Sequence, residues 1–165
     1  MKLVKDRLEL EECCAAMSGE DVVGLDLETT GLDPHKAVPR LVQLSTAKEV
    51  YVIDLFAVSE TDVLKRLLAA PRPLKIIHNA KFDSEFVLRH LGVRVGGVFD
   101  TYLASLLLSA GNEEHRHGLN AVTQRYLGRE LDKELQVSDW SGALSEAQIT
   151  YAAIDAEVLL PLYRT

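Results

Sequence analysis

The sequence has few cysteines and no long apolar run. Its only two cysteines, Cys13 and Cys14, are adjacent and form no CxxC spacing, which argues against both a disulfide framework and a thiolate metal site. No stretch of the sequence approaches the roughly 18 consecutive apolar residues that a membrane span requires. We therefore expect a cytoplasmic protein in a reducing compartment, with no membrane partner.

The sequence also lacks the excess of positive charge that is typical of proteins binding nucleic acid. The formal net charge is -7 and the sequence pI is about 5.2, whereas phosphates usually call for a basic partner. An enzyme that binds phosphates through divalent cations nevertheless needs a local cluster of carboxylates, because the cations then reverse the local sign. The net charge therefore does not exclude a nucleic-acid substrate.

Size and composition predict one globular domain over residues 1–165. The chain has 165 residues, of which 47% are hydrophobic and 26% charged. It shows no internal repeat, low-complexity tract or linker-like segment. A chain of this length can bury a single core.

Hydrophobic periodicity predicts a mixed α/β fold. We expect strands over 21–28, 40–46 and 49–55, whose short connections favour an antiparallel meander, and a further buried strand over 74–79. Helices are expected over 6–17, 59–70 with Ser59 as N-cap, 81–92 ending at Gly92, 100–109, 118–127 and 145–163. Helices gathered around a mixed sheet form a three-layer α/β domain.

Two carboxylates stand at the end of the first predicted strand. Residues two apart in a strand point to the same side, so Asp26 and Glu28 share one face while Val23, Leu25 and Leu27 share the other. Two like charges on one face repel each other and disfavour ionisation. The pattern therefore indicates that a positive group lies between them.

Two further pairs of polar residues are spaced four apart. Asn79 and Asp83 lie at a strand-to-helix junction, and Tyr151 and Asp155 are neighbours on the surface of the last predicted helix. An aspartate among the apolar residues of that helix is costly to bury unless it is paired or binds a metal. Each pair alone is compatible with an exposed strand end, a helix cap or a solvated helix face. Together the three pairs favour one functional site.

An oxygen-rich site of this kind suits Mg²⁺ or Mn²⁺, whereas zinc prefers histidine and cysteine. His115 and His117 are the one candidate pair for zinc, and a polar loop before a helix is the preferred interpretation. Two divalent ions about 4 Å apart could activate a water molecule and stabilise the leaving oxygen in phosphodiester hydrolysis. Tyr151 is a poor base at neutral pH, because its normal pKa is about 10, but it can orient the water.

Three segments carry a family resemblance. "DLETTGLDP", "HNAKFD" and "YAAID", in this order, resemble the motifs of the DEDD superfamily of 3′–5′ exonucleases, in the subgroup whose last motif is Tyr-x-x-x-Asp. This subgroup includes ribonuclease D, the Werner-type exonuclease domain and the proofreading domain of family A DNA polymerases. The resemblance runs from about residue 20 to 163. It implies a ribonuclease H-like fold with three antiparallel strands followed by parallel strands.

The resemblance also implies an activity and a set of roles. The expected reaction is hydrolysis at the 3′ end of DNA or RNA, with single strands preferred and nucleoside 5′-monophosphates released. Two Mg²⁺ or Mn²⁺ ions would be held by Asp26, Glu28, Asp83 and Asp155, with Asp83 acting directly or through water. Tyr151 would orient the attacking water.

Further residues match positions near the substrate. Thr29 and Leu32 match positions that contact the terminal nucleotide, although a turn residue and a loop residue are equally good interpretations, and Asn79 matches an asparagine near the substrate. Trp140 could stack on a base, which is worth ~1–3 kcal/mol, but packing in the core is preferred. Asp100 is expected to cap the following helix.

The sequence leaves two other functions open. One is a non-catalytic nucleic-acid-binding accessory module, and the other is a metal-dependent hydrolase of small nucleotides or dinucleotides. The basic residues that could follow a nucleic-acid backbone are scattered: Lys36, Arg40, Lys81, Arg116 and Lys133. A polymerase or another protein partner could therefore supply part of the substrate grip.

Overall fold

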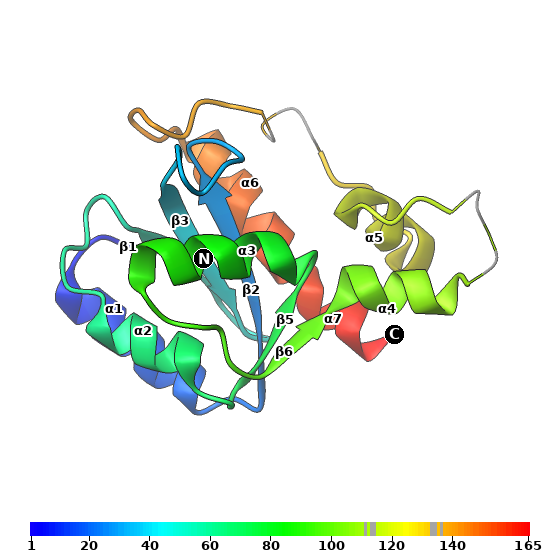
Figure 1. Ribbon diagram of the computed structural model, residues 1–165, viewed down its shortest axis with the longest axis horizontal. Coiled ribbons are helices and arrows are strands. Elements are labelled where there is room, and N and C mark those ends of the chain that lie inside the picture. The colour runs from blue at the N-terminus through cyan, green and yellow to red at the C-terminus, as the bar shows by residue number, and fades with distance from the viewer. Residues whose placement is uncertain (111, 113–114, 133–134, 136) are drawn as a thin grey trace.

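A computed structural model describes the whole chain except residues 111, 113–114, 133–134 and 136 (Figure 1). The elements, in chain order, are β1 (Lys2–Val4), α1 (Arg7–Ser18), β2 (Val22–Thr29), β3 (Pro39–Ser45), β4 (Val50–Asp54), α2 (Asp62–Ala69), β5 (Leu74–Ile77), α3 (Ala80–Phe86), the π-helix η1 (Val87–Leu91), β6 (Val98–Asp100), α4 (Thr101–Leu108), α5 (Leu119–Leu127), α6 (Glu146–Glu157) and α7 (Leu159–Arg164). Among the described residues, no helix is both long and apolar enough to cross a lipid bilayer.

The strands form one mixed sheet in the order β1-β4-β3-β2-β5-β6. β2, β3 and β4 are antiparallel neighbours, and β5 and β6 are added in parallel on the other side of β2. The predicted meander and the following parallel strands are therefore confirmed. β1, which pairs in parallel with β4, was missed because three residues are too few to show a strand period.

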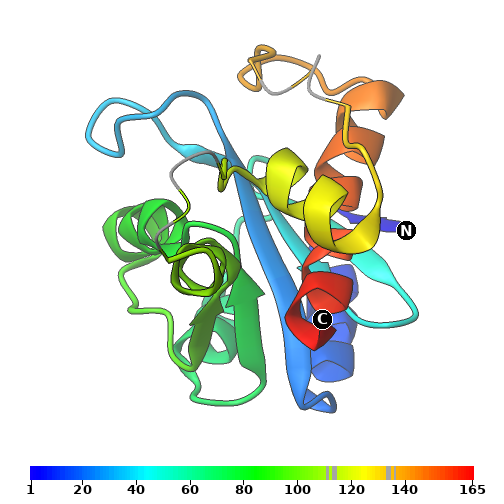
Figure 2. The same ribbon diagram turned by 90° about the vertical axis from the view of Figure 1, so that its right-hand side faces the viewer.

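The two faces of the sheet are covered by different helices. Val23, Leu25 and Leu27 of β2 belong to the main core together with buried residues of α1 and α2, while α6 and α7 pack on the opposite face. Figure 2 shows α6 and α7 on one side of β2 and α3 on the other. The three-layer arrangement and the alternation predicted for β2 are thus confirmed.

Two of the predicted helix boundaries differ from those of the structure, and one is confirmed. α2 begins at Asp62 with Thr61 as N-cap, so the prediction of Ser59 was wrong. Residues 58–61 form no regular element, and the side chain of Val58 is buried in the core. The helix expected over 81–92 continues as a π-helix and ends at Gly92, whose φ of 74° confirms it as the C-cap. The last predicted helix breaks at Val158, since Pro161 clashes with the carbonyl four residues earlier.

Local contacts fix the start of α6. Ser145 and Gln148 form a capping box, in which each side chain accepts a hydrogen bond from the backbone N–H of the other residue. The Gln148 amide also donates to Ser138 Oγ and to the Asp139 carbonyl, at 3.2 and 3.0 Å. The loop before α6 and the helix itself are therefore tied together.

α6 lies very close to the sheet at Gly24 of β2. A Cβ atom there would collide with Ser45 Oγ and lie 2.7 Å from the carbonyl oxygen of Ala156. Ser45 donates a hydrogen bond of 2.7 Å to that same carbonyl. Because Asp155 immediately precedes Ala156, these contacts fix the position of Asp155 relative to β2.

We predict that Gly24→Ala lowers the free energy of unfolding by about 1–3 kcal/mol, because the added methyl group overpacks the contact between β2 and α6. Chemical denaturation measures this change. The control is Gly19→Ala, where the nearest atom to the new Cβ is 3.6 Å away and the stability should change little. Equal stability of Gly24→Ala and the unsubstituted protein would contradict this account of the contact.

Candidate metal centre and active site

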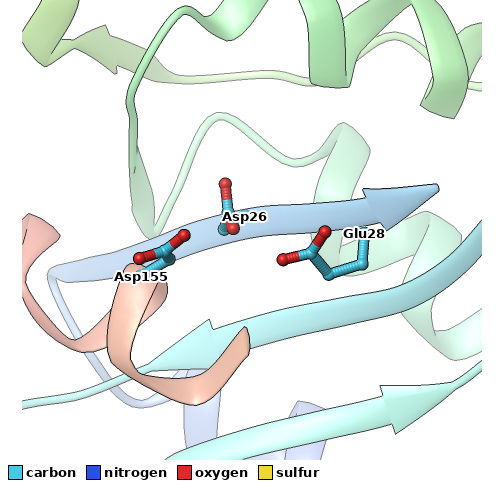
Figure 3. A group of neighbouring side chains, drawn as sticks. All are labelled: Asp26, Glu28 and Asp155. Atoms are coloured by element: carbon cyan, nitrogen blue, oxygen red, sulfur yellow. The ribbon is translucent and has the colours of Figure 1, made fainter. Parts of the chain in front are cut away.

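Three carboxylates meet at the carboxyl-terminal half of β2. Asp26 and Glu28 extend from the strand face that α6 covers, and Asp155 reaches them from α6 (Figure 3). One oxygen atom from each of the three side chains lies within 4.8 Å of the other two. The strand motif and the helix motif recognised in the sequence are therefore brought together as a group that could hold a metal ion.

Asp83 approaches the same place from α3. The pairing of β2 with β5 runs only from Val22 to Gly24, which leaves the later part of this edge of β2 to the residues that follow β5. Asp83 is 2% exposed, and the nearby backbone amide of Leu27 lowers the pKa of its carboxyl group, against the larger effect of burial. Its charge raises the pKa of Asp26 and Glu28, so it interacts with the three-oxygen group without being part of it.

The carboxylates hold their protons unusually strongly. Burial, followed by repulsion from the neighbouring acids, raises the pKa of Asp26 well above its usual range and that of Glu28 to about 8. Burial also raises the pKa of Asp83 to about 7. Within the part of the chain that the structure describes, no salt bridge reaches these three side chains. A bound cation would remove most of this repulsion.

Tyr151 lies one turn before Asp155 on α6, close enough for the Asp155 carboxylate to raise the pKa of its phenol. Burial, Asp155 and Glu28 raise the pKa of the phenol further above its usual value, so Tyr151 is neutral at physiological pH and acts as a donor. Trp140 is 3% exposed and packs beside Tyr151 with ring centroids 6.3 Å apart. The packing interpretation of Trp140 is therefore confirmed, although its side chain also lines the cleft.

The acids and Tyr151 line one open cleft of about 660 Å³. The three predicted substrate residues lie on its walls as well. Leu32 is 85% exposed, Thr29 donates from its hydroxyl to the Gly31 carbonyl at 2.7 Å, and Asn79 is held in the left-handed conformation with φ of 62°. Asn79 occupies the N-cap position of α3 but makes no side-chain cap.

Asp100 does more than the predicted capping of α4. Its Oδ1 accepts hydrogen bonds from the backbone amides of Tyr102 and Leu103, which confirms the cap. The same carboxylate accepts from the amides of Asn79 and Ala80, at 3.1 and 2.9 Å. Asp100 therefore holds the turn between β5 and α3, on which the placement of Asp83 depends.

His78 also lines the cleft, although the sequence motifs did not single it out. Its Nδ1 lies 3.0 Å from Thr101 Oγ1, and the Thr101 hydroxyl donates to the Ile77 carbonyl at 3.2 Å. Burial lowers the pKa of His78 to about 4, which keeps the ring neutral. The signal was available, since His78 immediately precedes Asn79 at the end of β5. Tyr102, Gly118, Leu119 and Val137 line the same cleft and carried no comparable signal.

The expectation for the other histidines is confirmed. His115 hydrogen-bonds Ser109 Oγ and His117 hydrogen-bonds Ser105 Oγ, as expected for polar residues of a loop. Among the described residues, the one group of side chains that could hold a metal ion is the set of Asp26, Glu28 and Asp155.

Arg40 does not face a substrate path, contrary to the expectation from the sequence. It is buried, lies 3.0 Å from Asp54 through its Nε, and donates to the Gly142 carbonyl at 2.9 Å. Arg40 thus connects β3 and β4 to the loop before α6. Lys36 and Lys81 are exposed and lie next to acids of their own segments, and Lys133 lies outside the described residues.

The sequence matches proteins that act as nucleases. It is 37% identical over 155 residues to DNA polymerase I of Aquifex aeolicus, which covers 93% of this chain and 25% of that protein. It is 31% identical over 163 residues to ribonuclease D of Haemophilus influenzae, covering 98% of this chain and 40% of that protein. The chain therefore spans less than half the length of these curated relatives.

The fold matches solved nuclease structures. The structure of Brucella melitensis NrnC bound to pGG is 30% identical in sequence and superposes with a TM-score of 0.83. The superposition covers 99% of this chain and 77% of that one. A structure of the same protein with bound Mg²⁺ is also known. A family model described as 3′–5′ exonuclease matches residues 1–165. The match covers every segment that contributes a carboxylate to the cleft, and the chain belongs to the 3′–5′ exonuclease family.

Proposed function

We propose that residues 1–165 form a single two-metal exonuclease domain, which removes nucleoside 5′-monophosphates from the 3′ ends of DNA or RNA. The observation that carries this proposal is the convergence of carboxylates from β2, α3 and α6 in one open cleft. A fold gains nothing from buried like charges, since each raises the pKa of the others. Bound divalent cations would explain why the carboxylates are clustered and would supply the missing positive charge.

The donor set fits Mg²⁺ or Mn²⁺, since these ions prefer oxygen ligands. Asp26, Glu28 and Asp155 would hold one ion, and Asp83 with Asp26 would hold the second, directly or through water. When bound, such ions supply an activated water and a counter-charge for the leaving oxygen. Every other step depends on side chains of the chain itself.

Tyr151 is proposed to orient the attacking water. Its phenol stays protonated because burial and the nearby carboxylates raise its pKa, so it donates a hydrogen bond and does not remove a proton. Its position one turn from Asp155 places the hydroxyl at the edge of the carboxylate cluster. Thr29, Leu32 and Asn79 are proposed to bind the terminal nucleotide, because they line the walls next to the acids.

A second candidate is the hydrolysis of very short substrates such as dinucleotides. It is favoured by the likeness to Brucella melitensis NrnC, which is known bound to pGG, and by the scattered basic residues. Longer strands would then require a polymerase or another protein partner for grip. A cytoplasmic location is also a proposal, supported by the two buried free thiols of Cys13 and Cys14.

The activity is tested with 5′-labelled single-stranded DNA, RNA of equal sequence and a dinucleotide, each with Mg²⁺, Mn²⁺ or EDTA. We expect metal-dependent shortening from the 3′ end. Asp26→Asn and Asp155→Asn should each slow hydrolysis at least ~100-fold, since a catalytic metal contributes several kcal/mol to transition-state stabilisation. Cleavage of the dinucleotide alone would select the second candidate.

The matched control for this assay is Asp62→Asn, which removes an exposed acid of α2 that pairs with Lys65 and should leave the rate unchanged. Hydrolysis that persists in EDTA or in the Asp26→Asn variant would overturn the metal-dependent mechanism. If the protein binds the oligonucleotides but hydrolyses none of the substrates under any condition, it is a non-catalytic nucleic-acid-binding accessory module.

The raised pKa values also predict how stability varies with pH without metal. Asp83 and Glu28 titrate at about 7 and 8 in the folded state and near 4 when unfolded, so the folded state binds more protons between these values. In EDTA the free energy of unfolding should therefore fall as the pH rises from 5 to 8.5. The expected decrease is a few kcal/mol, which is the size of the effect of one strongly shifted carboxyl group.

Two comparisons check this assignment by chemical denaturation. Asp155→Asn removes one source of repulsion, so it should flatten the decline and stabilise the metal-free protein at pH 8.5. Mn²⁺ added at pH 8.5 should restore stability to the unsubstituted protein and not to Asp155→Asn. Identical pH slopes for both proteins would show that the cluster does not cause the decline.

A further inference from the structure

Gln43 of β3 lies directly opposite Asp26 in the antiparallel pair of β2 and β3. Directly opposed residues share a face of the sheet, with Cβ atoms about 4.5–5.5 Å apart. On its other side Gln43 is paired with Val52 of β4, which is fully buried. α6 packs over this face, and its Ala152 and Ala156 belong to the same buried cluster as Val52. Gln43 is therefore enclosed by apolar side chains and by Asp26.

The Gln43 side chain is polar where the fold requires an apolar one. Its exposed fraction is 0%, and among the described residues neither Oε1 nor Nε2 has a hydrogen-bond partner. A buried amide without a partner destabilises a protein by about 1–3 kcal/mol. By contrast Ser45, two residues further on the same face, is satisfied by its bond to Ala156. Packing alone thus does not account for an amide at position 43.

The chemistry of the neighbouring group explains the amide. A carboxylate has about four acceptor positions, of which metal ligation uses only some. A neutral N–H donor beside it can fix its orientation without adding the positive charge that would compete with a metal ion. Ligating carboxylates are commonly held by such outer partners.

We propose that Gln43 is a positioning residue for Asp26: its Nε2 donates to one buried water molecule that donates in turn to the Asp26 carboxylate, and this link holds the carboxylate in the orientation that binds the divalent ion. This inference rests on the proposed function, because it concerns the same metal centre. It assigns to Gln43 no contact with substrate and no part in the chemical step.

The test variant is Gln43→Met, which keeps the length of the side chain and removes its polar atoms. Calorimetric titration of the EDTA-stripped protein with Mn²⁺ alone should show a Kd raised about 10–100-fold, as is typical when an outer partner of a metal ligand is lost. The melting temperature of the metal-free variant should equal or exceed that of the unsubstituted protein, since an unpartnered amide has been removed. Gln43→Leu provides a second apolar variant should Gln43→Met fold poorly.

The matched control is Thr123→Val on α5. Thr123 is also fully buried, and its hydroxyl has no partner among the described residues, but α5 carries none of the carboxylates. The control should leave the affinity for Mn²⁺ unchanged while the melting temperature is kept or raised. A residue with only a structural role would behave like Thr123, so an unchanged Kd in both Gln43 variants would overturn the proposal.

The outcome also separates this inference from the function on which it rests. If the unsubstituted protein binds no Mn²⁺, or if the Asp26→Asn variant binds Mn²⁺ with the same affinity, the assignment of the metal centre is wrong. If Asp26→Asn abolishes binding while the Gln43 variants bind normally, the metal centre stands and the role of Gln43 is refuted. In the assay with Mn²⁺ at a fixed concentration below saturation, the proposal predicts a lower kcat with little change in KM for the oligonucleotide.

Discussion

The burial of several like-charged carboxylates, together with the repulsion between them, is the constraint on which the rest of this structure depends. Asp26, Glu28 and Asp83 all have raised pKa values, and burial is the largest cause in each case. The metal-free protein therefore holds its active site at the expense of stability, as binding sites often do. A divalent cation bound among the carboxylates would offset their repulsion, so metal binding and folding stability are linked.

The surrounding elements act against this repulsion by holding each acid from a different side. Gly24 and Ser45 bring α6 against the sheet and so place Asp155. Asp100 fixes the turn that leads into α3 and its Asp83. Buried Arg40 connects the meander to the loop before α6. Rigid support of this kind is what a site needs if its ligands are to stay in place when they repel one another.

Local patterns in the sequence were enough to predict the elements that carry the site. The two-residue period of β2 places Asp26 on the face opposite the main core, and the four-residue spacing places Tyr151 beside Asp155. Features set by long-range contacts were not predictable. Arg40 was expected among the basic residues that could follow a nucleic-acid backbone, because its pairing with Asp54 depends on contacts between two strands. Gln43 could not be recognised from the sequence, because its proposed role depends on the strand register that places it opposite Asp26.

The central claim is that these carboxylates bind two divalent ions. Crystals soaked in Mn²⁺ and measured at a wavelength where manganese scatters anomalously test it most directly. The account predicts two anomalous peaks in the cleft, one among Asp26, Glu28 and Asp155 and one between Asp26 and Asp83. A single peak among the first three acids would contradict the two-metal claim, and the absence of any peak in the cleft would contradict the metal centre as a whole.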